Sequence, residues 1–79
     1  MIEVIDAKYI EGYQIWLKFN NGISGNVDLK NDLWGSVFEP LKNIDEFKRF
    51  TISKEFGTIL WESEADFAPE YLLKKLSIS

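Results

Sequence analysis

A hairpin signal near the N-terminus limits the fold of this chain more than any other feature. Asn20-Asn21-Gly22 separates the segments Tyr13–Phe19 and Ile23–Leu29, in which apolar side chains recur at alternate positions. Alternation places those side chains on one face of a strand, and Asn-Gly tolerates the positive φ angles of a tight turn. We therefore expect two antiparallel strands that share an apolar face.

The rest of the chain supplies more strands and two helix starts. Asn43, followed by acidic residues, is typical of a helix N-cap, and Pro69 is a favoured first helical residue. The β-branched and aromatic composition of strands recurs in Ile2–Ile10, Phe50–Lys54 and Thr58–Trp61. The expected fold is a single α+β domain over residues 1–79, with a small antiparallel sheet and two short helices in the order β-β-β-α-β-β-α.

A dense apolar core is needed to fold a chain of only 79 residues. Hydrophobic residues make up 46% of the sequence and aromatic residues 15%, which is enough to build one without disulfides or a structural metal. The expected core consists of Val4, Ile15, Leu17, Phe19, Val27, Leu29, Phe38, Leu41, Phe47, Ile52, Ile59, Trp61, Leu72 and Leu76.

Composition also limits where the protein works. The chain contains no cysteine, which favours the reducing cytoplasm over an oxidising compartment. Its first residues lack the basic and apolar regions of a signal peptide, and no apolar run approaches the roughly 20 residues that span a bilayer. We expect a cytoplasmic protein that does not enter membranes.

The net charge of −4 bears on the choice of partner. Nucleic-acid binding depends on a basic face that neutralises phosphates, so a nucleic-acid ligand is not expected. An acidic surface instead favours a basic protein partner through long-range attraction.

Catalysis and metal binding lack the usual residues. With no histidine and no cysteine, the chain cannot form the common nucleophile–base pairs or transition-metal sites. Glu62, Glu64 and Asp66 have the spacing that begins a calcium loop, but Phe67 and Leu73 occupy the positions of its required Gly and Glu. We therefore expect no enzyme activity, no metal and no cofactor.

Tryptophans and this acidic segment remain as candidate contact residues. Trp16 lies on the strand face opposite Ile15 and Leu17, where either a helix covers it, as we expect, or it is exposed for a partner. Trp34 lies in a loop next to Gly35 and is expected to be partly exposed. The predicted protein contact consists of Trp16, Trp34, Glu62, Glu64 and Asp66.

Short motifs in a fixed order cover nearly the whole chain. They are a strand ending in Phe19, then Asn21-Gly22, Val27-Asp28-Leu29, Val37-Phe38-Glu39-Pro40-Leu41, Asp45-x-Phe47, Gly57-Thr58-Ile59-x-Trp61, Asp66 and Pro69-Glu70-x-Leu72. This pattern resembles the bacterial domain of unknown function 2442 family. The resemblance implies a small α+β domain with no assigned catalytic residues, and a role as the antitoxin-like member of a two-gene pair.

Other functions stay open at this stage. A nucleic-acid-associated accessory domain of a transcriptional regulator would need Lys48, Arg49, Lys74 and Lys75 to converge on one face. An enzyme would need a deep pocket that holds two carboxylates. An open edge of the sheet could also support a homodimer.

Overall fold

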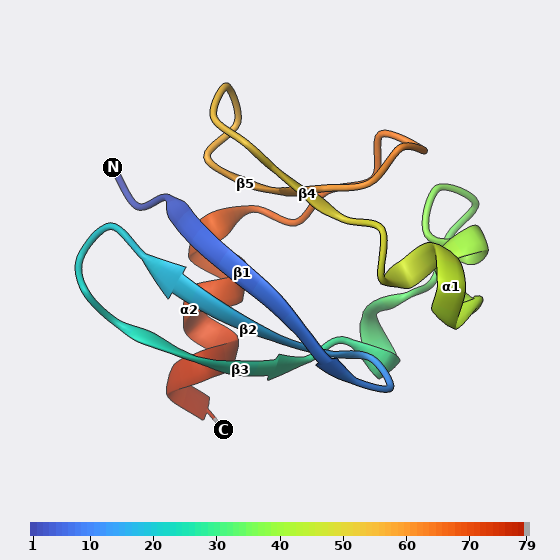
Figure 1. Ribbon diagram of the computed structural model, residues 1–79, viewed down its shortest axis with the longest axis horizontal. Helices are drawn as coiled ribbons and strands as arrows, with labels where there is room; N and C mark the ends of the chain where they lie inside the picture. Colours follow the sequence, from blue (N-terminus) through green and yellow to red (C-terminus); the bar gives the residue numbers. More distant parts are fainter. Residues whose placement is uncertain (79) are drawn as a thin grey trace.

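Two antiparallel sheets and two helices make up the fold (Figure 1). A computed structural model describes residues 1–78, with side chains as far as Leu76. The first sheet has the spatial order β1-β2-β3 and the second pairs β4 with β5. Their bounds are β1 Val4–Glu11, β2 Gln14–Phe19, β3 Ser24–Asp28, β4 Thr51–Ser53 and β5 Thr58–Leu60. The α+β class and the order of strands and helices are confirmed, with the five strands divided between two sheets.

Helical segments connect and follow the strands. The two α-helices are α1, Ile44–Phe47, and α2, Pro69–Ile78, and two 3₁₀ turns, η1 (Lys30–Asp32) and η2 (Glu39–Lys42), lie between β3 and α1. Asn43 caps α1, because its Oδ1 accepts hydrogen bonds from Asp45 N at 2.9 Å and Glu46 N at 3.3 Å. No helix within residues 1–78 has the length and apolarity to cross a bilayer.

The hairpin predicted at Asn21-Gly22 joins β2 to β3. Gly22 has a φ of 87°, and Phe19 N donates to Ile23 O at 2.8 Å across the turn. The register that follows is unbroken and places Ile15 opposite Val27. Both are buried, so this face of the sheet forms the core.

Helix α2 covers that face of the first sheet (Figure 1). Leu72 is fully buried there, and the position of a Cβ on Gly25 would lie only 3.2 Å from Leu76 Cδ2. A glycine at residue 25 therefore lets α2 approach β3 closely.

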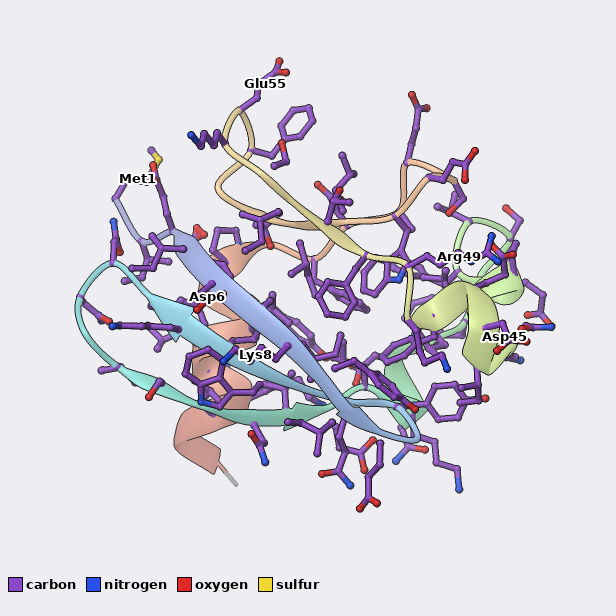
Figure 2. All side chains as sticks on the ribbon, viewed as in Figure 1. Met1, Asp6, Lys8, Asp45, Arg49 and Glu55 are labelled. Atoms are coloured by element: carbon purple, nitrogen blue, oxygen red, sulfur yellow. The ribbon has the colours of Figure 1, made fainter. Side chains whose placement is uncertain are left out.

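Trp16 lies on the other face, so the expectation that a helix covers it is wrong. It pairs with Lys8 across β1 and β2, and Lys8 Nζ lies 5.7 Å from its ring centroid. Figure 2 shows Lys8 on the side of the sheet that is turned away from α2. Trp16 is half-buried, and the side chain that covers its ring is that of Lys8, not one from a helix.

Buried loop residues complete the core. The predicted core residues are buried, except that Phe38, Ile52 and Leu76 are half-buried and pack against it. Leu33, Ala65 and Phe67 join the core from segments between the regular elements, and the sequence prediction missed them. The core therefore extends beneath the loops that carry the candidate site.

Candidate functional site

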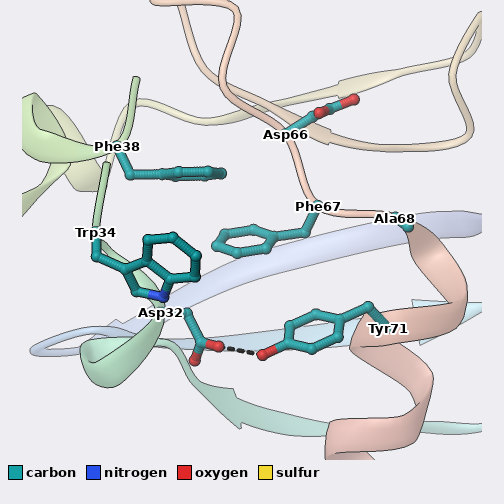
Figure 3. A pocket seen from close by; sticks show the side chains of 7 residues that line it. All are labelled: Asp32, Trp34, Phe38, Asp66, Phe67, Ala68 and Tyr71. Atoms are coloured by element: carbon teal, nitrogen blue, oxygen red, sulfur yellow. Dashed lines mark hydrogen bonds between the residues drawn. The ribbon is translucent and has the colours of Figure 1, made fainter. Parts of the chain in front are cut away.

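An open groove of about 380 Å³ lies between the segment that follows η1 and the beginning of α2 (Figure 3). Its walls are largely aromatic, and two aspartates lie among its lining residues. We call it the aromatic groove; it is lined by Asp32, Trp34, Phe38, Asp66, Phe67, Ala68 and Tyr71.

Stacked rings give the groove a firm wall. Phe67 stacks between Phe38, at 4.8 Å between ring centroids, and Tyr71, at 6.1 Å. Its backbone is also held, because Thr58 Oγ1 donates a 2.6 Å hydrogen bond to Phe67 O inside the protein. Phe67 is only 8% exposed and therefore anchors the more exposed rings on either side.

Trp34 forms the opposite wall and is 75% exposed. The loop presents it outward because Leu33 is buried in the core on one side and Gly35, at a φ of 90°, turns the chain on the other. Within the described residues its ring has no aromatic or cation partner. A large exposed aromatic ring beside an apolar groove is a common feature of protein contact sites.

A polar cluster closes the base of the groove and joins its two walls. Asp32 accepts a short hydrogen bond from the Tyr71 hydroxyl through Oδ1 and a 2.8 Å bond from Lys75 Nζ through Oδ2. Tyr71 and Lys75 are four residues apart on α2, so both face the loop that carries Asp32. We call these three residues the Asp32 clasp.

The hydrogen bonds of the clasp raise the pKa values of Tyr71 and Lys75. The hydrogen bond from the Tyr71 hydroxyl to Asp32 raises the pKa of Tyr71 above its ordinary value, and burial raises it further. The hydrogen bond to Asp32 also raises the pKa of Lys75. Both groups therefore keep their protons more firmly than free side chains do.

Within residues 1–78 no group of three or more acidic side chains is arranged to hold a metal ion.

The acidic segment predicted from the sequence borders the groove on one side. A tight turn, in which Trp61 N donates to Ala65 O at 3.0 Å and Glu64 has a φ of 68°, exposes Glu62 and Glu64. Asp66 lines the groove, and Figure 3 shows its carboxylate pointing away from the Trp34 ring. Within the described part of the chain these three carboxylates have no ion-pair partner.

Five predicted contact residues thus fall into two places. Trp34 and Asp66 line the aromatic groove, while Glu62 and Glu64 lie on the loop beside it. Trp16 lies apart from them on the exposed face of the first sheet.

Several groove residues were not identified as a site from the sequence. Phe38 was predicted only as core, and Asp32, Phe67, Ala68 and Tyr71 were not assigned to a contact. The available signal was spacing: Phe67, Tyr71 and Lys75 follow one another at intervals of four around the helix start at Pro69.

The four basic residues considered for a nucleic-acid interface lie on two separate segments. Lys48 and Arg49 follow α1 and lie 4.0 Å and 3.9 Å from Asp45 and Glu46. Lys74 and Lys75 belong to the last turns of α2, at the opposite end of the molecule from α1 (Figure 1). The convergence that a nucleic-acid interface requires is absent for these four residues.

Comparison with protein families identifies one match. The model of a family described as a protein of unknown function, DUF2442, matches residues 4–76. No curated protein and no solved structure gave a significant match. The matched region contains both sheets, the aromatic groove and the Asp32 clasp. The chain therefore belongs to the DUF2442 family.

Proposed function

We propose that this domain is a non-catalytic protein-binding module, and that the aromatic groove is its binding site. The observation that carries the proposal is the Trp34 ring, which is 75% exposed opposite the stacked rings of Phe67 and Tyr71. Leaving so large an apolar surface in water is unfavourable by roughly 25 cal/mol per Å². A partner side chain inserted between the walls would recover that free energy.

Charge indicates the chemistry of the partner. The domain has a net charge of −4, and the carboxylates of Glu62, Glu64 and Asp66 lie on or beside the groove without ion-pair partners in the described residues. Ser63 Oγ lies 3.5 Å from Val37 O, so the acidic loop lies next to the segment that carries the groove residue Phe38. We infer that the occupant is a protein segment with an apolar or aromatic side chain next to Lys or Arg.

The proposal of binding without catalysis rests on the available side chains. The chain has neither histidine nor cysteine, and the clasp raises the pKa of Tyr71. We further propose that the partner is encoded next to this gene, as in an antitoxin-like pair, and that the two proteins meet in the cytoplasm. The absence of cysteine supports that compartment.

The groove can be tested with defined synthetic peptides followed by NMR. A peptide with a central Trp flanked by Arg residues should shift the indole N–H signal of Trp34. The Trp61 indole is bonded to Phe47 O at 2.8 Å in the interior, so its signal should stay in place. A peptide with Glu in place of Arg should bind more weakly. Equal binding of the two peptides, or a shift confined to Trp16, would refute the groove assignment.

Matched variants test the same site with the product of the adjacent gene. Trp34→Ala should reduce its affinity at least tenfold, as expected for a central aromatic contact. Phe56→Ala is the control, because Phe56 is also exposed, at 56%, but lies in the β4–β5 turn outside the groove. If the adjacent protein does not bind while the Arg-flanked peptide does, the gene-pair part of the proposal fails and the binding module stands.

A further inference from the structure

The free edge of the first sheet has the regular backbone that strand addition requires. The sheet ends at β3, and the register between β2 and β3 runs without a bulge from Gln14↔Asp28 to Lys18↔Ser24. β3 contains no proline and no lysine, two residues that protect edges in other proteins. A second groove, of about 480 Å³, is lined by Gln14 of β2 and by Gly25, Asn26, Val27 and Asp28 of β3.

The opposite edge of the same sheet is protected. Strand β1 has two register irregularities, between Val4 and Asp6 and between Tyr9 and Glu11. In addition, Val4 N donates a 2.8 Å hydrogen bond to Gly57 O of the β4–β5 ribbon. Bulges and a covering segment are ways in which proteins block strand addition. The contrast between the edges singles out β3.

The alternation of hydrogen bonds between β2 and β3 shows which backbone N–H and C=O groups of β3 do not bond to β2. Phe19 N donates to Ile23 O, and Leu29 N donates to Tyr13 O, at the two ends of the β2–β3 ladder. Antiparallel pairs alternate, so the odd-numbered residues of β3 bond to β2 and the even-numbered residues point outward. The outward N–H and C=O groups are those of Ser24, Asn26 and Asp28.

We propose that β3 pairs with β3 of a second copy of this chain, forming a continuous six-stranded antiparallel sheet. The two-fold axis lies at Asn26, so that Asn26 faces Asn26 of the other copy and Ser24 faces Asp28. All outward groups of residues 24, 26 and 28 are then paired across the axis. This register places no like charges opposite each other, whereas an axis at Asp28 would oppose two carboxylates.

Two variants at one position separate dimer pairing from effects within the monomer. Within one chain Ser24 faces Lys18, and across the proposed interface it faces Asp28 of the second copy. Ser24→Lys should therefore destabilise the monomer slightly and tighten the dimer, and Ser24→Asp should do the reverse. Two symmetric cross-strand pairs change the dimer dissociation constant by about 2- to 30-fold in each direction.

Sedimentation equilibrium from micromolar to millimolar protein, at physiological salt, measures this constant. We expect the unmodified chain to dimerise, Asn26→Pro to remain monomeric because it lacks the outward N–H, and Asn26→Ala to dimerise. Circular dichroism establishes whether each variant is folded. If Asn26→Pro does not fold, the dissociation constants of the Ser24→Lys and Ser24→Asp dimers test the proposal instead. A monomer at all concentrations, or shifts of the same sign for both Ser24 variants, would overturn the proposal. Trp34→Ala should dimerise normally, so this test is independent of the aromatic groove.

Discussion

Asp32 accepts a hydrogen bond from Lys75 Nζ at 2.8 Å, although the two residues are 43 positions apart in the sequence. The pair is mostly withdrawn from solvent, with side-chain exposures of 11% for Asp32 and 27% for Lys75. It fixes α2 to the loop that carries Trp34 and so sets the separation of the two groove walls. The contribution of this ion pair to the free energy of unfolding, and the dependence of that contribution on pH, can both be measured.

Replacing Asp32 with Asn should lower the free energy of unfolding by about 1–3 kcal/mol, because Lys75 loses its charged acceptor in a partly buried position. Thermal denaturation followed by circular dichroism measures the change. Lys42→Gln is the control: it removes the ion pair with Glu39, which is 3.2 Å long but exposed, and should change stability by about 0.5 kcal/mol or less. Equal effects of the two substitutions would show that the clasp is not a stabilising contact.

Alkaline pH should weaken the same clasp. The hydrogen bonds to Asp32 raise the folded-state pKa of Tyr71 and Lys75 above their ordinary values of 10.0 and 10.5. The folded state therefore holds these protons more firmly than the unfolded state, and the stability they contribute is fully present below pH 10. It is lost as the pH rises through the folded-state pKa values. Urea denaturation at pH 8 and pH 11 should show a larger loss for the unmodified chain than for a Tyr71→Phe, Lys75→Met variant.

Thr58→Val should loosen the groove wall while nearly preserving volume. The substitution removes the 2.6 Å hydrogen bond from Thr58 Oγ1 to Phe67 O and leaves a carbonyl without that donor in the interior. We expect a loss of about 1–3 kcal/mol in the free energy of unfolding, measured by urea denaturation. Ser53→Ala serves as comparison, since Ser53 Oγ accepts its bond from Phe56 N in an exposed turn. A loss for Ser53→Ala as large as that for Thr58→Val would contradict this account.

Gly57→Ala should destabilise the contact between the two sheets. Gly57 has a φ of 64°, and a Cβ there would lie 2.8 Å from Glu3 Cγ. The backbone conformation alone costs about 1–2 kcal/mol for a residue with a side chain. Gly12→Ala, at a φ of 53° with no atom near the added Cβ, isolates the conformational cost. Adding Glu3→Ala to Gly57→Ala should restore part of the difference, and no recovery would rule out the steric contribution.

Local patterns in the sequence predicted the regular elements well, because their causes are local. Alternation and Asn21-Gly22 gave the β2–β3 hairpin, and the cap at Asn43 and the start at Pro69 match α1 and α2. The division into two sheets depends on how β1 meets the β4–β5 ribbon in space. No local pattern encodes that contact, so it was not predicted.

The site was only partly predictable for the same reason. Trp34 was expected to be partly exposed because it lies in a loop next to Gly35, and it is 75% exposed. Phe67 lies in an irregular segment, where buried residues do not recur at a regular spacing in the sequence. Neither its place in the core nor its role in the groove was therefore predicted. Trp16 was misjudged because two helices were thought available to cover the sheet, one on each face, whereas α2 covers the Ile15 face and α1 packs against η2.

The hydrogen bond from Val4 to Gly57 gives the chain an internal reporter of partial opening. If the β4–β5 ribbon swings away while the β1–β2–β3 meander stays intact, the amide proton of Val4 exchanges with solvent, but that of Leu17 stays protected. The difference between the exchange rates of these two amides measures how independently the ribbon moves from the rest of the protein.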